Sequence, residues 1–441
     1  MEIEKSTPIA VDVVDKILEC SDIKQISTAS IREVKKLINR IEETSGISFI
    51  RMEMGIPGLP ACSIGVQAQI EALQHGVASI YPDIDGIPEL KTEMSKFVKN
   101  FLNLTVSPES CIPTVGSMMG GMAGFMTLAR AHEQRDTTLF IDPGFPVQKQ
   151  QHRVLGLKYE TFDVYHYRQE KLRDKLESYL KQGHIHSIMY SNPNNPSWIC
   201  FTEQELQIIG DLANQYQVFI FEDLAYFGMD FREDISCPGK PPYQPTVGHY
   251  TDNYLLLISA SKAFSYAGER IGMMVFSDTL FHRRFPDLLP CFGTDILGKA
   301  AIYGAIYAIS SGTSHSAQYA LAAILKACNT GEYNYLKDVK LYGEKAARMK
   351  KMFTENGFVI VYDKDGQQPL ADGFYFTIAY PGLSGEQLLK ELLYYGISAI
   401  SLAITGSEHH EGLRACVSLV PAEALPELEK RLQWFNHNHQ K

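Results

Sequence analysis

The sequence predicts an α/β fold, in which a mostly parallel sheet is covered by helices on both faces. Two observations carry this prediction. From about residue 113 onward, helical and strand-like segments alternate, which is typical of βαβ units. The strand-like segments are short and apolar throughout rather than alternating, as expected of strands buried on both faces. Beyond residue 334 the pattern changes to a long charged helix followed by further strands and helices, which predicts a second, smaller α+β domain.

The expected elements follow in chain order. Two amphipathic helices, at residues 10–20 and 31–44, precede a loop rich in glycine and proline at residues 55–60. In the larger domain we expect helices at 117–132, 170–181 and 203–216, and strands at 138–141, 158–162, 187–190, 218–222, 255–258 and 273–276. Thr202 and Glu205 have the spacing of a capping box, which places a helix start between them. In the smaller domain we expect helices at 335–356, 385–395 and 422–435, and strands at 358–362, 374–379 and 415–419.

Composition excludes several classes of function. The net charge of −10 argues against binding to nucleic acid or to anionic membranes. No apolar run reaches membrane-spanning length, and the segment Met1–Lys5 lacks the apolar core of a signal peptide. The eight cysteines are scattered without a C-x-x-C pair, which favours reduced thiols over disulfides or a zinc site. We therefore expect a cytoplasmic protein that has no metal centre.

The most informative segment is Ser259-Ala260-Ser261-Lys262. It follows the expected strand at 255–258, and open α/β sheets bind ligands at the carboxyl ends of their strands. An amine desolvated there, with Arg270 nearby, can lose its proton near neutral pH and then condense with an aldehyde. Taken alone, the segment is equally compatible with an ordinary surface lysine.

Three further segments bear on this choice. Asn195 lies in a proline-stiffened turn directly after a strand; Asp223 ends an apolar strand, three residues before Tyr226; and a loop at Gly116 and Ser117 opens a helix. Such a loop presents backbone N–H groups to a phosphate, and a carboxylate at a sheet edge can keep a pyridine nitrogen protonated. Each segment alone also has a simpler interpretation: a polar turn, a helix cap, or close helix packing.

Together these segments resemble the class I/II (fold type I) aminotransferases of the aspartate aminotransferase-like kind, which use pyridoxal 5′-phosphate (PLP). The motifs occur in the family's order: glycine loop, aromatic residue after a proline, Asn-Pro, Asp-x-x-Tyr, Ser-x-x-Lys, Arg-x-Gly and a late arginine, between Gly55 and Leu419. The resemblance implies a large PLP-binding domain at residues 55–334 with a seven-stranded sheet. It also implies a small C-terminal domain at 335–441, with residues 1–54 forming an arm and helices that pack on it.

The resemblance also implies roles around the cofactor ring. Lys262 would carry PLP covalently, and Asp223 would pair with the pyridine nitrogen. Asn195 and Tyr226 would hydrogen-bond the 3-oxygen, so that Lys262, Asp223 and Tyr226 form the catalytic set. Phe145, which precedes Pro146, would stack on the ring face.

The phosphate would be bound by five residues of one chain, with a tyrosine of the neighbouring subunit in a homodimer. The five are Gly116, Ser117, Met118, Ser259 and Arg270, and the tyrosine is Tyr81.

For the substrate, the resemblance implies contacts with Arg414, Asn195 and Gly55, where Arg414 binds the α-carboxylate in a bidentate fork. Two positions depart from the family's pattern. Trp198 stands where a glycine usually follows Asn-Pro, and Gly58 stands where an acidic residue usually follows Gly-x-Pro.

The expected function is transfer of an amino group from an L-amino acid to a 2-oxo acid by two half-reactions (a ping-pong mechanism), within amino acid metabolism or biosynthesis. A C–S lyase or a decarboxylase on the same framework remains an alternative. A non-catalytic PLP-binding sensor is less favoured, because the segment before Gly55 has no basic helix pair for DNA binding. Aspartate, alanine and aromatic amino acids all remain open as donors.

Overall fold

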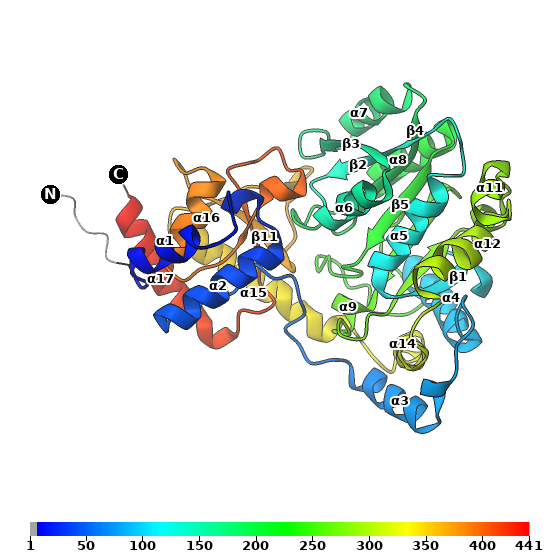
Figure 1. Cartoon of the computed structure of the whole chain (residues 1–441), viewed down its shortest axis with the longest axis horizontal. Coiled ribbons are helices and arrows are strands. Elements are labelled where there is room, and N and C mark those ends of the chain that lie inside the picture. Colours follow the sequence, from blue (N-terminus) through cyan, green and yellow to red (C-terminus); the bar gives the residue numbers. More distant parts are fainter. Residues whose placement is uncertain (1–6, 441) are drawn as a thin grey trace. The chain divides into compact units, whose positions relative to one another are not determined.

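The fold was analysed in a computed structural model, which describes residues 7–440. The expectation that Met1–Lys5 is not a signal peptide concerns residues outside this range. The described chain forms two compact units (Figure 1). The first contains the described residues up to Gly58, the segment Asn195–Ile199 and the chain from Lys340 onward; the second contains Leu59–Asn194 and Cys200–Val339.

The second unit is built on a seven-stranded sheet, as predicted. Its order is β1-β7-β6-β5-β4-β2-β3, and every neighbouring pair is parallel except the two pairs made by β7. The strands are β1 (Cys111–Thr114), β2 (Thr137–Asp142), β3 (Lys158–Asp163), β4 (Ile185–Ser191), β5 (Phe219–Leu224), β6 (Tyr254–Ser259) and β7 (Gly272–Phe276). All residues of these strands are buried except part of the edge strand β3, which explains their apolar sequences. Strand β1 was not predicted; its Pro113 is tolerated because the strand lies at an edge of the sheet.

Helices cover both faces of this sheet (Figure 1). The helices of this unit are α3 (Ser63–Gln74), α4 (Pro88–Leu102), α5 (Gly116–Leu128), α6 (Pro146–Leu155), α7 (Glu170–Leu180), α8 (Glu203–Tyr216), α9 (Ala260–Ala263), α10 (Asp278–His282), α11 (Leu289–Phe292), α12 (Leu297–Lys299), a π-helical segment (Ala300–Ile306), α13 (Tyr307–Ser310) and α14 (His315–Thr330). The predicted capping box is present, because the Thr202 hydroxyl accepts from the Glu205 N–H and the Glu205 carboxylate accepts from the Thr202 N–H. Helix α5 packs on β5, β6 and β7 and ends at Leu128 rather than at His132.

The first unit is built on a four-stranded antiparallel sheet in the order β12-β13-β11-β8. Its strands are β8 (Val359–Ile360), β11 (Tyr375–Ala379), β12 (Ile400–Ser401) and β13 (Leu413–Cys416), and a separate hairpin pairs β9 (Lys364–Asp365) with β10 (Gln368–Pro369). Its helices are α1 (Val11–Glu19), α2 (Ile31–Ser45), α16 (Gly385–Tyr394) and α17 (Leu425–His439); α15 (Leu336–Glu355) runs through residue 340, where this part of the unit begins. The N-terminal segment joins this unit through backbone hydrogen bonds from Ile9 to Tyr394 and from Ile50 to Gly396.

The units change at residues 58/59 and 339/340, and residues 195–199 group with the first unit, which the sequence did not indicate. The domain boundaries at 54 and 334 stay predictions. The assignment of the second unit as the PLP-binding domain stays a proposal. Among residues 7–440, no helix combines the length and the apolar character needed to cross a membrane. All eight cysteines are described, and no disulfide bond joins any two of them.

Candidate active site

Four of the candidate residues lie at one edge of the large sheet. Strands β2, β5 and β6 run parallel, so their carboxyl ends lie at the same edge. Asp223 lies on the penultimate position of β5, and Lys262 follows the end of β6 by three residues. Phe145, half-buried, is the N-cap of α6 after β2, and Tyr226 is buried just after β5. The strand order therefore brings together side chains that are far apart in the sequence.

Asp223 is a buried carboxylate with two hydrogen-bond donors. The Gln148 side-chain Nε2 donates to its Oδ2 at 2.8 Å, and the Ala225 backbone N–H donates to its Oδ1 at 3.1 Å. Burial raises the pKa of Asp223 to about 6, and the two donors oppose that rise by favouring the charged form. The sequence analysis missed Gln148, although its position three residues after Phe145 at the start of a helix was a signal that it points toward the same edge.

The glycine loop and Arg270 form a small cationic cradle. Gly116 begins α5 with a φ of +66°, and a Cβ there would lie 2.6 Å from Nη2 of Arg270. Gly272 pairs with Thr114 on one side and Ser259 on the other, and a Cβ on Gly272 would lie 2.9 Å from the Ser117 nitrogen. Side chains are thus excluded where the backbone N–H groups of α5 and the Arg270 guanidinium meet, which is the arrangement that binds phosphate.

Ser259 and Lys262 lie beside this cradle. Ser259 caps the short helix α9, because its hydroxyl accepts from the Ser261 N–H at 3.1 Å, and Lys262 is half-buried. Met118 is half-buried in the first turn of α5, and its carbonyl accepts from Gln151 at 2.9 Å. Tyr81, the residue expected from the neighbouring subunit, is 93% exposed.

The substrate-binding candidates lie in the other unit. Arg414, on β13, is 1% exposed; its Nη1 donates to Asn195 Oδ1 at 3.1 Å, and its Nη2 donates to the Glu53 carbonyl at 2.7 Å. Within residues 7–440 its Nε has no hydrogen-bond partner. A buried guanidinium with an unused N–H is suited to bind a carboxylate, since leaving such a donor unpaired is costly.

Gly55 and the unexpected Trp198 both adjoin Tyr375, which the sequence analysis did not single out. A Cβ on Gly55 would lie 1.9 Å from the Tyr375 hydroxyl, and the Trp198 ring packs edge-on against the Tyr375 ring. Trp198 is fully buried and adopts a φ of +67°, in the left-handed region that usually requires glycine. The turn geometry expected of a glycine is therefore kept by a tryptophan.

The residues of the second unit fit PLP. Its phosphate suits a cradle from which side chains are excluded, and its pyridine nitrogen suits a buried carboxylate held by two donors. Lys262 supplies an amine at the same sheet edge. No observation among these residues conflicts with the cofactor that the motifs imply.

Comparison with known proteins identifies the family of the chain. The family model "Aminotransferase class I and II" matches residues 55–432. An aspartate aminotransferase of Pyrococcus horikoshii is 25% identical over 253 residues, which span 57% of this chain and 60% of that protein. The glutamate-pyruvate aminotransferase AlaC of Escherichia coli is 29% identical over 208 residues, which span 45% of this chain and 47% of that protein. The matched region is thus less than two thirds of the length of these relatives.

Solved structures show the same fold. A double mutant of Thermus thermophilus aspartate aminotransferase superposes with a TM-score of 0.74 at 16% identity, covering 96% of this chain and 98% of that one. An alanine aminotransferase from Pyrococcus furiosus superposes with a TM-score of 0.75 at 20% identity, covering 94% and 98%. The family model covers most of the chain, and the motifs lie in the family's order on the family's fold. The chain belongs to the class I and II aminotransferases.

Proposed function

We propose that this protein is a PLP-dependent aminotransferase, which moves an amino group from an L-amino acid to a 2-oxo acid in two half-reactions. The observation that carries the proposal is Asp223, a buried carboxylate held by Gln148 at the sheet edge where Lys262 follows β6. A buried carboxylate with two hydrogen-bond donors at this edge suits a cofactor ring that carries positive charge.

When bound, PLP supplies an electron sink for the electrons left behind when a bond to the substrate Cα breaks. Lys262 would hold the cofactor covalently, and Asp223 would keep its ring nitrogen protonated and stabilise that charge. Tyr226 and Asn195 would donate to the 3-oxygen, and Phe145 would stack on the ring. The phosphate would be bound by Gly116, Ser117, Met118, Ser259 and Arg270.

The substrate would be bound through its α-carboxylate by Arg414 and Asn195, beside Gly55. The Lys262 amine, once the substrate has displaced it, would take the proton from the substrate Cα as a general base and deliver it to the cofactor carbon C4′ as a general acid within the same half-reaction. In the second half-reaction it would move a proton in the opposite direction. The first 2-oxo acid would leave before the second one binds, while the amino group stays with the enzyme, which is the basis of ping-pong kinetics.

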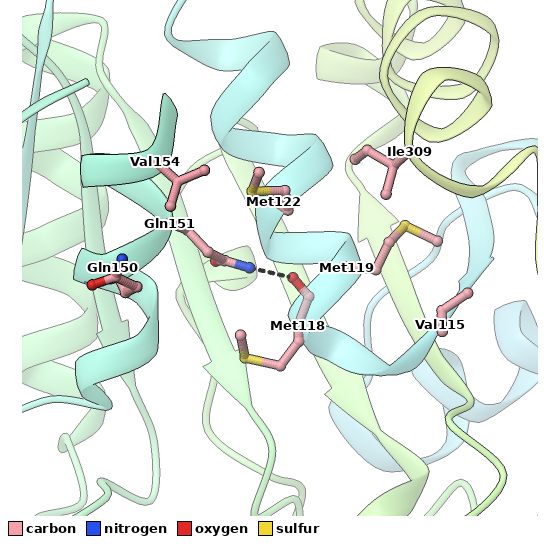
Figure 2. Close-up of a pocket in the computed structure, with 8 residues that line it drawn as sticks. All are labelled: Val115, Met118, Met119, Met122, Gln150, Gln151, Val154 and Ile309. Atoms are coloured by element: carbon pink, nitrogen blue, oxygen red, sulfur yellow. Dashed lines mark hydrogen bonds between the residues drawn. The ribbon is translucent and has the colours of Figure 1, made fainter. Parts of the chain in front are cut away.

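A surface of the second unit supports a homodimer as the functional form. Helices α5, α6 and α13 border an apolar cavity of about 360 Å³, lined by Val115, Met118, Met119, Met122, Gln150, Gln151, Val154 and Ile309 (Figure 2). Val154 is 68% exposed, and Tyr303 and Tyr307, just before Ile309 in the chain, are more than half exposed. Apolar surface of this kind is typical of a subunit interface, so we propose that a second copy of the chain covers it.

The dimer is tested by light scattering on wild type and on Val154→Asp. We expect twice the mass of one chain for the wild type and dissociation toward one chain for Val154→Asp. Val359→Asp, at an exposed apolar position of the first unit, is the matched control and should remain dimeric. A wild type with the mass of one chain would refute the dimer.

We also propose that the protein is located in the cytoplasm.

The activity is tested by absorbance spectroscopy of the purified protein with PLP and a panel of L-amino acids. We expect a visible cofactor band that disappears with a donor amino acid, release of the matching 2-oxo acid, and restoration of the band by 2-oxoglutarate or pyruvate. Lys262→Ala should lack the band of the covalent cofactor. Release of pyruvate with ammonia, or of CO₂, would instead indicate the lyase or the decarboxylase, and a band that no amino acid changes would indicate a sensor.

A further inference from the structure

Tyr375 lies directly against the guanidinium of Arg414. The two residues occupy adjacent antiparallel strands, β11 and β13, in which Thr377 is paired with Arg414 and Tyr375 with Cys416. Tyr375 is therefore the diagonal neighbour of Arg414 on the same face of the sheet, a distance that an aromatic side chain can span. The guanidinium carbon lies 4.4 Å from the centre of the tyrosine ring, within the range of a cation–π interaction.

The surroundings of Tyr375 hold its ring in this position. A Cβ on Gly55 would lie 1.9 Å from the tyrosine hydroxyl, so glycine is needed there to admit the ring. The Trp198 ring packs edge-on against the Tyr375 ring, with a centroid distance of 6.1 Å and an interplanar angle of 69°. Trp198 itself requires Gly373, because a Cβ on Gly373 would lie 1.9 Å from the indole Cε2. Two glycines and a tryptophan thus fix the orientation of one tyrosine.

Within the described chain, the contacts of Arg414 use only part of its donor capacity and leave N–H donors for a ligand. Asn195 Oδ1 and the Glu53 carbonyl accept from its two terminal nitrogens, and the Tyr375 ring covers one face. The Nε–H has no partner within residues 7–440, although Arg414 is almost fully buried. A carboxylate is the ligand that best satisfies such a donor.

We propose that Tyr375, held by Trp198, is the positioning residue that orients Arg414 for the substrate carboxylate. The proposal rests on the proposed function for the identity of the substrate. It assigns a purpose to one of the two departures from the family's pattern, since Trp198 packs against Tyr375. Tyr375 acts through Arg414 and need not touch the substrate.

The test compares Tyr375→Leu, which removes the aromatic face, with Tyr375→Phe, which keeps it. For Tyr375→Leu we expect the KM of the donor amino acid to rise about 10- to 30-fold, with kcat changed less than about threefold, from the loss of a desolvated cation–π contact. Tyr375→Phe should remain within about threefold of the wild type in KM, because the ring stays over the guanidinium. Affinity for PLP should be unchanged in both.

Phe376→Leu is the matched control. Phe376 is the next residue of β11, equally buried, but its side chain is on the opposite face, where it packs against Phe353. Its replacement should lower the melting temperature as Tyr375→Leu does, while leaving KM unchanged. An equal rise of KM in both variants, or no rise in Tyr375→Leu, would show that Tyr375 is only a packing residue. If Tyr375→Leu does not fold, Tyr375→Met, which conserves more of the volume, replaces it.

A second measurement does not depend on turnover. Binding of maleate, a simple dicarboxylate, is measured by calorimetry on the PLP-loaded wild type and variants. We expect about 10- to 30-fold weaker binding in Tyr375→Leu and near wild-type binding in Tyr375→Phe and Phe376→Leu. Equal affinity in all variants would overturn the positioning role. Turnover that fails in the wild type while maleate binding follows the expected order would refute the proposed function but retain the role of Tyr375.

Discussion

Replacing Gln148 with leucine should shift the pH range in which the protein binds PLP. Gln148 donates one of the two hydrogen bonds that favour the charged form of Asp223, at 2.8 Å, and both residues are buried. Leucine has a similar size but no donor. The substitution therefore removes an interaction with the carboxylate and little else.

The size of the shift follows from the contact. A hydrogen bond to a charged group contributes about 1.5–3 kcal/mol, and one pKa unit corresponds to about 1.4 kcal/mol. The pKa of Asp223, which burial raises to about 6, should therefore rise by a further one to two units, roughly, in Gln148→Leu. Near neutral pH the wild-type Asp223 is mostly ionised, whereas in the variant it would be largely protonated. A neutral carboxyl group cannot stabilise the positive charge of the cofactor ring.

The assay is equilibrium titration of the cofactor-free protein with PLP across a range of about pH 5.5 to about pH 8.5. We expect the acid-side midpoint of binding to move upward by about one to two pH units in Gln148→Leu. Gln182→Leu, at an exposed glutamine just beyond the end of α7, is the control and should behave like the wild type. A midpoint in Gln148→Leu that coincides with that of the wild type would show that Gln148 does not support the charged form of Asp223.

Three further substitutions have expected outcomes. Gly116→Ala places a Cβ 2.6 Å from Arg270 Nη2 at a φ of +66°, so PLP affinity, measured by the same titration, should fall about tenfold or more, while a wild-type affinity would refute the cradle. Burial raises the pKa of Glu222 from 4.5 to about 7. Between these pH values the carboxyl group is protonated in the folded state and ionised in the unfolded state, so the free energy of unfolding falls as pH rises from about 4.5 to about 7. Glu222→Gln should remove about 3 kcal/mol of this pH dependence, as measured by urea unfolding at about pH 5 and about pH 8; an unchanged slope would contradict the raised pKa. Trp198→Gly relieves about 1 kcal/mol of left-handed strain but loses about 3–5 kcal/mol of buried ring, so urea unfolding should show a net loss of about 2–4 kcal/mol, whereas a gain would mean that strain dominates.

The position of the cofactor-side candidates at one edge of the sheet could be predicted from the sequence. Asp223 and Lys262 each come at or just after an apolar strand, and parallel strands place such residues at one edge whatever the loops do. Gln148 was not predicted, because its contact depends on how far α6 is rotated about its axis. Strand β1 was missed because it is short and contains Pro113.

The substrate side was less predictable, because its contacts join distant segments. Tyr375 meets Arg414 through the register of β11 and β13, and a shift of one residue would turn the ring to the opposite face. Nothing in the local sequence of either strand specifies that register. The grouping of residues 195–199 with the first unit depends in the same way on where Trp198 is buried.

Trp198 shows how a departure from a family pattern can be compensated elsewhere in the chain. The left-handed turn is a position where glycine avoids strain, but a strain of about 1–2 kcal/mol is smaller than the stabilisation from burying an indole ring. The room for that ring is provided by Gly373, where any side chain would overlap the indole. Residue 373 must therefore be a glycine, because residue 198 is a tryptophan whose indole ring fills the space of any side chain at residue 373. The tryptophan then ties the segment that carries Asn195 to Tyr375 and so to the sheet that carries Arg414, which gives the two carboxylate-binding candidates a common support within one unit.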